Sequence, residues 1–282
     1  MKNNDQTKQK TIIFLILTFA LTIFISSILV TSGGMEGRDG MVFLIMWSPG
    51  VSAIITCLIF QKNLHGLGWK LGKLKYILIS YCIPLLVALV TYSIIWITGL
   101  GKFQMVKQYE FGNMTCGVVG IKNPPFVVAL PVMLTLGLFL RLLFALGEEI
   151  GWRGFLVPNF AKIFSLKKAA IISGVIWFLY HIPGLFFLEY YSVSRLKSAI
   201  FFMILAVSAS VIMFWIRIKS GSLWTAAIFH ASHNLAIQGI FNEFTIDTGN
   251  THFFSGEFGI GIGLVYAILA VWFWRRMGRL QS

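Results

Sequence analysis

The stretch that decides the fold is LTLGLFLRLLFALGEEIGWRG, residues 134–154. An apolar run ends at Leu146 and is followed almost at once by two adjacent carboxylates, Glu148 and Glu149. Charged side chains at membrane depth are rare, face a bundle interior or a watery cavity, and by default mark a functional site. The stretch therefore predicts a membrane-embedded helix that carries a polar site near its end.

Helical spacing within this stretch separates the two carboxylates. Glu149 and Arg153 stand at i and i+4, so they can pair on one face of a helix. Glu148 is rotated from Glu149 by about 100° and points into a different environment. We expect Arg153 to support Glu149 and leave Glu148 available for chemistry. Three glycines of the stretch are expected to permit close helix packing: Gly147, Gly151 and Gly154.

The composition of the chain indicates an integral membrane protein. Of its 282 residues 57% are hydrophobic and 12% are charged, with a mean hydropathy of +0.81. A soluble domain carries about a quarter charged residues. The net charge of +13 arises mostly from short loops between apolar runs, which is the positive-inside pattern. We therefore expect a lipid bilayer, and no nucleic acid, as partner.

Eight apolar segments are long enough to cross a bilayer: residues 11–30, 41–60, 76–98, 126–146, 169–188, 199–216, 223–240 and 258–274. With alternate loops on opposite sides, 16 of the 23 Lys and Arg residues lie on the side of the termini and six on the other. This asymmetry predicts cytoplasmic termini. The predicted fold is an all-α bundle of about eight transmembrane helices, forming one polytopic domain over residues 1–282.

Polar groups recur inside two of these spans, and the glutamate pair follows a third. His181 follows Trp177 by one helical turn, and His230 and Asn234 stand at i and i+4 on one face. At 1.5 Å per residue, His230 lies about 10 Å and His181 about 20 Å from the cytoplasmic boundary. Glu148 approaches from the other direction. The four groups are expected to converge between the bilayer midplane and the cytoplasmic leaflet.

Single residues of this set also have structural interpretations. A histidine in a membrane helix commonly serves as an interhelical hydrogen-bond partner, and this interpretation is open for His181 taken alone. His233 is expected to be structural, and Trp152 and Tyr180 are expected to serve in packing. Only the combination of the polar groups indicates chemistry.

Carboxylate, imidazole and carboxamide groups in a partly dry cavity suit amide hydrolysis. Glu148 can take a proton from water and direct the hydroxide at a carbonyl carbon. One histidine can position that water or protonate the leaving amine, and a second histidine with an asparagine can stabilise the oxyanion.

A metal-dependent route is the alternative. Glu148, His181 and His230 would supply the two-histidine, one-carboxylate set of a catalytic zinc site. The H-E-x-x-H spacing is absent from the sequence, and Asn234 is a poor zinc ligand. The pattern favours metal-free chemistry, so no cofactor is expected, with Zn²⁺ as the alternative.

Three ordered motifs resemble those of a known family: Glu148-Glu149-x-x-x-Arg153, Trp177-x-x-x-His181 and His230-x-x-x-Asn234. They are similar to the motifs of the CAAX protease and bacteriocin-processing (CPBP) family, intramembrane endopeptidases related to the type II CAAX prenyl proteases. The motif-bearing region, residues 132–240, would be the catalytic core. The family motif usually opens with phenylalanine where this chain has Trp177.

The resemblance implies a role for each motif residue. Glu148 and His181 would activate the water, and His230 and Asn234 would hold the oxyanion. The pair formed by Glu149 and Arg153 would support the site. The family has been described both as metalloproteases and as glutamate-dependent proteases, so the resemblance leaves metal dependence open.

The function expected from these residues is hydrolysis of a peptide bond near the cytoplasmic side of the membrane. The substrate would be a peptide or a membrane-anchored protein, and the location a cell membrane, expected to be a bacterial cytoplasmic membrane. Relatives are associated with peptide pheromone maturation, bacteriocin leader processing and self-immunity. Two alternatives stay open: a non-catalytic scaffold or immunity protein of the same fold, and a proton-coupled transporter. A transporter would be expected to show internal repeats, which the sequence lacks.

Overall fold

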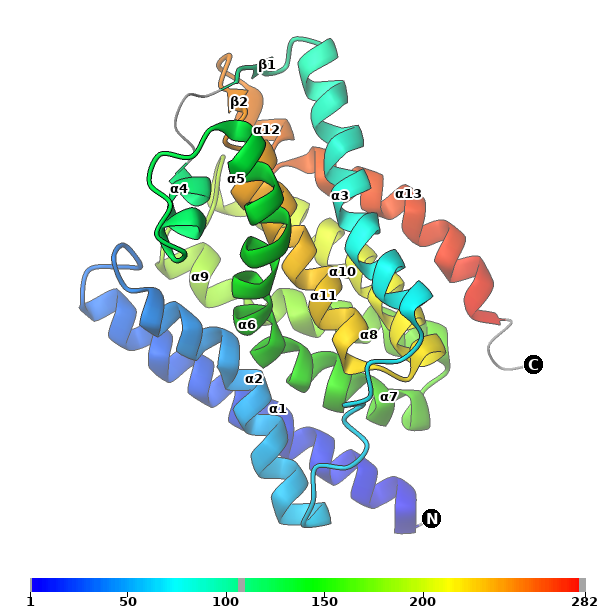
Figure 1. Ribbon diagram of the computed structural model, residues 1–282. Coiled ribbons are helices and arrows are strands. Elements are labelled where there is room, and N and C mark those ends of the chain that lie inside the picture. The colour runs from blue at the N-terminus through cyan, green and yellow to red at the C-terminus, as the bar shows by residue number, and fades with distance from the viewer. Residues whose placement is uncertain (1, 106–109, 279–282) are drawn as a thin grey trace.

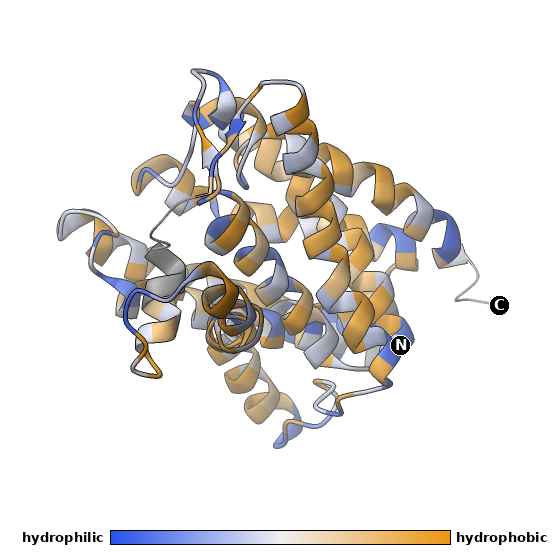
Figure 2. Cartoon of the chain, turned by 45° about the horizontal axis from the view of Figure 1, so that its top comes forward, coloured by the Kyte–Doolittle hydropathy of each residue, from blue (hydrophilic) through white to orange (hydrophobic). Residues whose placement is uncertain are grey.

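A computed structural model describes residues 2–105 and 110–278 as a bundle of helices (Figure 1). In this part of the chain, seven helical stretches are long and apolar enough to cross a membrane: Asp5–Thr31, Asp39–Gln61, Leu74–Ile97, Phe126–Ile163, Leu166–Phe187, Arg195–Ser220 and Ile260–Met277. Hydrophobic residues cover the helices and hydrophilic ones gather at the connections (Figure 2). The prediction of an all-α, multi-pass membrane protein is confirmed.

The described residues form thirteen α-helices, three π-helical turns and two short strands. In chain order they are α1 (Lys2–Thr31), α2 (Asp39–Gln61), α3 (Leu74–Ile97), β1 (Lys102–Phe103), α4 (Glu110–Gly117), α5 (Phe126–Val132), η1 (Met133–Gly137), α6 (Leu138–Glu149), η2 (Ile150–Leu156), α7 (Val157–Ile163), α8 (Leu166–Tyr180), α9 (Ile182–Phe187), α10 (Arg195–Ser220), α11 (Leu223–Asn234), η3 (Leu235–Phe241), β2 (Thr245–Ile246), α12 (Thr251–Phe254) and α13 (Ile260–Met277).

The expected span 223–240 is helical, as α11 followed by η3, but it is not among the seven apolar stretches. Its polar side chains lower its hydropathy. Most of α11 is buried, because it packs against α3, α6 and α10 in the middle of the bundle (Figure 1). A helix surrounded by protein needs no continuous apolar surface. Its N-terminus is capped by Ser222, whose Oγ accepts a hydrogen bond from Trp224 N at 3.2 Å.

The helix that carries the glutamate pair is longer than the predicted span 126–146 and continues to Ile163. It changes from α to π geometry at η1 and again at η2, directly after Glu149. In the same way η3 follows Asn234. Short π-helical turns inside α-helices occur frequently at functional sites. A local widening of the helix therefore lies inside the first motif, directly after Glu149, and another directly follows the third motif.

The predicted span 169–188 is broken at its histidine. The helix α8 ends at Tyr180, His181 forms a turn, and α9 begins at Ile182 with Pro183 in its first turn. Proline suits this position because its missing N–H would lack an intrahelical partner anyway. The break leaves His181 at the end of a helix and partly exposed.

Short elements lie together at the end of the bundle away from the termini (Figure 1). The polar connection 99–125 contains β1 and α4, while residues 106–109 of it lie outside the described residues. β1 pairs antiparallel with β2, with Lys102 opposite Ile246. This pairing ties the connection between α3 and α5 to the segment between η3 and α13.

Close packing against α2 fixes the helix of the glutamate pair, as the glycines predict. A Cβ atom on Gly147 would lie 2.6 Å from Cγ of Trp47, and one on Gly151 would lie 2.5 Å from Cβ of Pro49. Gly154 is less crowded, because the nearest atoms to its added Cβ lie at 3.4 Å. The two helices thus approach closely beside the site only because positions 147 and 151 lack side chains.

Candidate active site

The four residues predicted to form the site line one cavity of about 920 Å³ in the described part of the chain: Glu148, His181, His230 and Asn234. Glu148 is 2% exposed, His230 5% and Asn234 8%. They come from α6, from the turn after α8 and from α11. Three segments far apart in the sequence thus meet at one concave site, as the sequence predicts.

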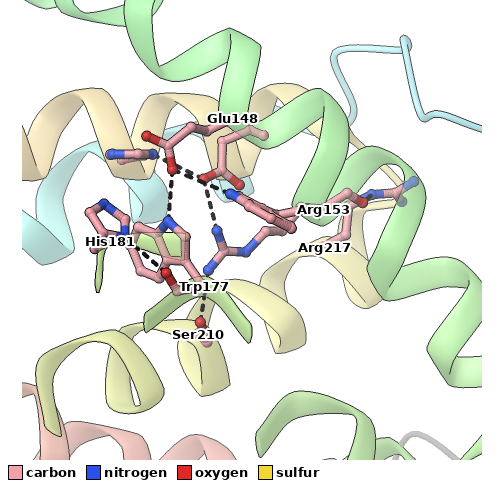
Figure 3. Close-up of polar contacts among 9 residues, drawn as sticks. Glu148, Arg153, Trp177, His181, Ser210 and Arg217 are labelled. Atoms are coloured by element: carbon pink, nitrogen blue, oxygen red, sulfur yellow. Dashed lines mark hydrogen bonds and ion pairs between the residues drawn. The ribbon is translucent and has the colours of Figure 1, made fainter. Parts of the chain in front are cut away.

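Two tryptophans hold the Glu148 carboxylate. Its Oε2 accepts a hydrogen bond from Nε1 of Trp177 at 2.7 Å and another from Nε1 of Trp152 at 3.3 Å (Figure 3). Its Oε1 has no hydrogen-bond partner among the described residues. One oxygen is therefore fixed by neutral donors, and the other is left for a ligand in the cavity. Trp152, which the sequence assigned to packing, also has this polar contact.

His181 is oriented by the backbone of its own helix. Its Nδ1 lies 2.8 Å from the carbonyl oxygen of Trp177 (Figure 3). Because a carbonyl oxygen can only accept, we assign the ring proton to Nδ1. The neutral ring then carries a lone pair on Nε2, the nitrogen that can accept a proton. The ring packs against Phe202, with 4.7 Å between ring centroids.

Glu149 binds two cationic or potentially cationic groups at once. Its Oε1 lies 2.8 Å from Nη1 of Arg153, the predicted i,i+4 contact, and 3.0 Å from Nδ1 of His230. All three side chains are buried. Nη2 of Arg153 also donates to Oγ of Ser210 at 2.9 Å (Figure 3). Glu149 therefore positions a residue of the site as well as its own supporting arginine.

Asn234 lies one turn beyond His230 on α11 and lines the same cavity. In the described part of the chain its carboxamide has no hydrogen-bond partner. An amide group that faces a cavity without an internal partner can donate to a ligand there. Its placement fits the oxyanion role that the resemblance implies.

Trp177 connects the members of the site. Besides its bond to Glu148, its ring centroid lies 5.4 Å from that of His230 and 5.8 Å from that of His181. The guanidinium carbon of Arg153 lies 4.5 Å from the ring centroid, a cation–π distance. Sequence reasoning identified this position only as an aromatic. The sequence did contain a signal for the contact with Glu148, because tryptophan, unlike phenylalanine, can donate a hydrogen bond.

His233 takes part in a second group of polar residues on the cavity wall. Its Nδ1 lies 3.0 Å from the hydroxyl of Tyr266, and its Nε2 lies 4.0 Å from Oε1 of Glu257. Glu257 also accepts hydrogen bonds from Nε2 of Gln238 and from the hydroxyl of Tyr190. Burial raises the pKa of Glu257 above its usual value. The sequence missed Glu257, because a glutamate in an acidic loop gives no sign of burial.

Three donor atoms of the set nominated for Zn²⁺ already have partners: Nδ1 of His230, Nδ1 of His181 and Oε2 of Glu148. Nε2 of each histidine and Oε1 of Glu148 have no hydrogen-bond partner among the described residues, and a metal-binding histidine commonly has such a partner on its other nitrogen. Across residues 2–105 and 110–278, no three His, Cys, Asp or Glu side chains are grouped so that they could hold a metal ion. The set nominated for Zn²⁺ is therefore not gathered as metal ligands in this arrangement of the described residues.

The fold and the cavity define a multi-pass membrane protein with a buried site of carboxylate, imidazole and carboxamide groups. Residues 130–236 match the family model of type II CAAX prenyl endopeptidase Rce1-like proteins. The match contains all three motifs, so the resemblance inferred from them is confirmed.

A similar curated protein is CAAX prenyl protease 2 of Methanococcus maripaludis. The two sequences are 35% identical over 103 residues, which are 35% of this chain and 38% of the relative. The matched region thus spans less than two fifths of the relative's length.

Proposed function

We propose that this protein is an intramembrane endopeptidase whose catalytic core is residues 132–240. The observation that carries the proposal is the convergence of Glu148, His181, His230 and Asn234 on one cavity. The family match over residues 130–236 supports it. The proposed location is a bacterial cytoplasmic membrane, supported by the short Lys-rich loops.

In this proposal Glu148 and His181 activate a water molecule. Oε1 of Glu148 takes a proton from the water, and Nε2 of His181 accepts a hydrogen bond that orients it. The water oxygen attacks the carbonyl carbon of the substrate. The proton held by Glu148 then passes to the amide nitrogen as the carbon–nitrogen bond breaks, which returns Glu148 to its ionised form.

His230 and Asn234 stabilise the negative oxygen that forms on the substrate carbonyl. Asn234 donates through its carboxamide N–H. Because Nδ1 of His230 already donates to Glu149, donation from Nε2 requires a doubly protonated ring, whose charge Glu149 balances. Glu149 and Arg153 act as positioning residues in this scheme, since they reach the substrate only through His230.

The proposed substrate is a peptide or a membrane-anchored protein. A cavity of about 920 Å³ is at the upper end of the range for small-molecule sites, which leaves room for several residues of an extended chain. The curated relative is named a prenyl protease. For this chain we propose only a peptide bond presented to the cavity, with no metal or other cofactor required.

The test compares peptide termini in membranes that carry the wild type, Glu148→Gln or Glu36→Gln. Glutamine keeps an oxygen for the two indole donors but cannot take the proton, so new termini should appear with the wild type and disappear with Glu148→Gln. Glu36 is exposed and does not line the cavity, so Glu36→Gln is the matched control. Unchanged cleavage by Glu148→Gln would refute the proposal. Full biological function without any cleaved product would favour the scaffold, and Glu148-dependent flux in proteoliposomes would favour the transporter.

A further inference from the structure

The cavity reaches the surface at one end of the bundle. The elements β1, β2, α4 and α12 lie at that end (Figure 1). Its lining includes residues from several connections at that end: Met35, Asp39, Tyr190, Ser192, Asp247 and His252. The side chains of Asp247 and His252 are 44% and 64% exposed. From Arg141, also in the lining, to Glu148 the helix descends about 10 Å. The site thus lies at the bottom of a cavity that opens at this end, which we call the open end.

The opposite end is closed beneath the site by the connection 62–73 between α2 and α3. Three hydrogen bonds hold this connection against the bundle: Arg217 Nη2 to Leu67 O at 3.3 Å, Leu223 N to Gly68 O at 2.8 Å, and Trp224 Nε1 to Trp69 O at 2.7 Å. The same Arg217 donates through Nε to the carbonyl oxygen of Arg153 at 2.8 Å. No residue of this connection is among those that line the cavity.

The charges of the two ends differ strongly. The closed end carries the start of α1, the end of α13, the connections 62–73 and 164–165, and the start of α11. Among the described residues it holds 14 Lys and Arg residues, against five at the open end, with Arg141 and Arg153 between them. Short loops rich in Lys and Arg stay in the cytoplasm. The closed end is therefore the cytoplasmic one by this rule.

We propose that the cavity opens on the non-cytoplasmic face of the membrane, and that the site takes peptide bonds presented from that face. The part that concerns substrate rests on the proposed function, whereas the direction of opening rests on geometry and charge alone. The sequence led us to expect hydrolysis near the cytoplasmic side. That expectation came from the depth of the histidines in the membrane. Their depth indicates where the bottom of the cavity lies, but it does not indicate on which face the cavity opens.

The first experiment measures the direction of opening without using activity. The native cysteines Cys57, Cys82 and Cys116, which form no disulfide with one another, are replaced by alanine, and one cysteine is introduced by Ser192→Cys or by Lys70→Cys. Ser192 lines the cavity at the open end, and Lys70 is exposed at the closed end. A membrane-impermeant maleimide is applied to intact and to permeabilised cells.

We expect Ser192→Cys to react in intact cells and Lys70→Cys to react only after permeabilisation. The reverse pattern would overturn the proposal. Failure of Ser192→Cys to react even in permeabilised cells would also overturn it, because the mouth would then be closed to water. Adding Glu148→Gln to each variant should leave the labelling unchanged, which separates this result from any effect of catalysis.

The second experiment tests the side from which substrate arrives. A single-span membrane protein that carries a cleavable segment is made in two versions, with the segment on the cytoplasmic or on the non-cytoplasmic side of its span. Cleavage of only the non-cytoplasmic version, lost with Glu148→Gln, is expected. Cleavage of only the cytoplasmic version would refute this inference and leave the proposed function standing. If neither version is cleaved while Ser192→Cys reacts in intact cells, the proposed function is refuted and the inferred direction of opening still stands.

Discussion

Removal of Arg153 should destabilise the folded protein far more than removal of a surface charge. Arg153 is 1% exposed and Glu149 is 0% exposed, with 2.8 Å between Nη1 and Oε1. In Arg153→Met the carboxylate of Glu149 keeps only His230 as a partner among the described residues, and its Oε2 has none. Breaking a buried ion pair by removing one partner costs about 3–5 kcal/mol. The lost bond to Ser210 brings the expected cost toward the upper end of that range.

A double-mutant cycle checks the origin of this cost. The free energies of unfolding of the wild type, Arg153→Met, Glu149→Gln and the double variant are measured by denaturant titration in mixed micelles. Because the double variant removes both charges of the Arg153–Glu149 pair, it should be more stable than the sum of the single changes by about 1–3 kcal/mol. Lys219→Met, at an exposed position, is the control and should change stability by less than about 0.5 kcal/mol. A loss at Arg153 as small as that of the control, or additive effects, would refute the reasoning.

Three further predictions concern the surroundings of the site. Trp177→Phe removes the shorter indole bond to the carboxylate of Glu148, so kcat/KM for peptide cleavage should fall by about ten- to a hundredfold. Trp152→Phe removes the 3.3 Å bond and should lower kcat/KM less. Equal losses in the two variants would contradict this account. Gly151→Ala should lower the melting temperature markedly, because its Cβ would lie 2.5 Å from an atom of α2, whereas Gly40→Ala, with no atom within 4 Å of its Cβ, should not. Burial raises the pKa of Glu257 above its usual 4.5, so the folded protein holds this proton more tightly than the unfolded chain does. The contribution of Glu257 to the free energy of unfolding is therefore fully present below pH 4.5 and is lost as the pH rises through the pKa of the folded state. Glu257→Gln should flatten the dependence of the melting temperature on pH.

Periodic and local features of the site could be predicted from the sequence. The i,i+4 relation of Glu149 and Arg153 survives the change to π geometry after Glu149, because both residues lie within about one turn. Ser222 caps α11 as its residue type predicts. Gly147 and Gly151 admit α2 as small residues in membrane helices do. Each of these depends on residues close together in the chain.

Long-range partners could not be predicted in this way. The bond between His230 and Glu149 joins residues 81 positions apart, and the spacing within HxxxN pointed only to Asn234 as a neighbour. Arg217, placed by the sequence at the end of a span, instead folds back to the backbone of Arg153. The mouth of the cavity depends on loops whose arrangement has no periodic signal. Polarity identified which side chains are functional candidates, but only packing decides what each of them touches.

The two adjacent carboxylates illustrate why the packing matters for chemistry. Glu149 faces Arg153 and His230, so its charge is balanced by cationic partners and it is poorly suited to accept a proton from water. Glu148 faces two indole groups, which orient one of its oxygens without neutralising it. A carboxylate held by neutral donors keeps its capacity to take a proton, whereas one held by cations stabilises positive charge nearby. Exchanging the partners would exchange the roles, so the rotation of about 100° between neighbours on a helix is enough to divide the pair into a base and a support.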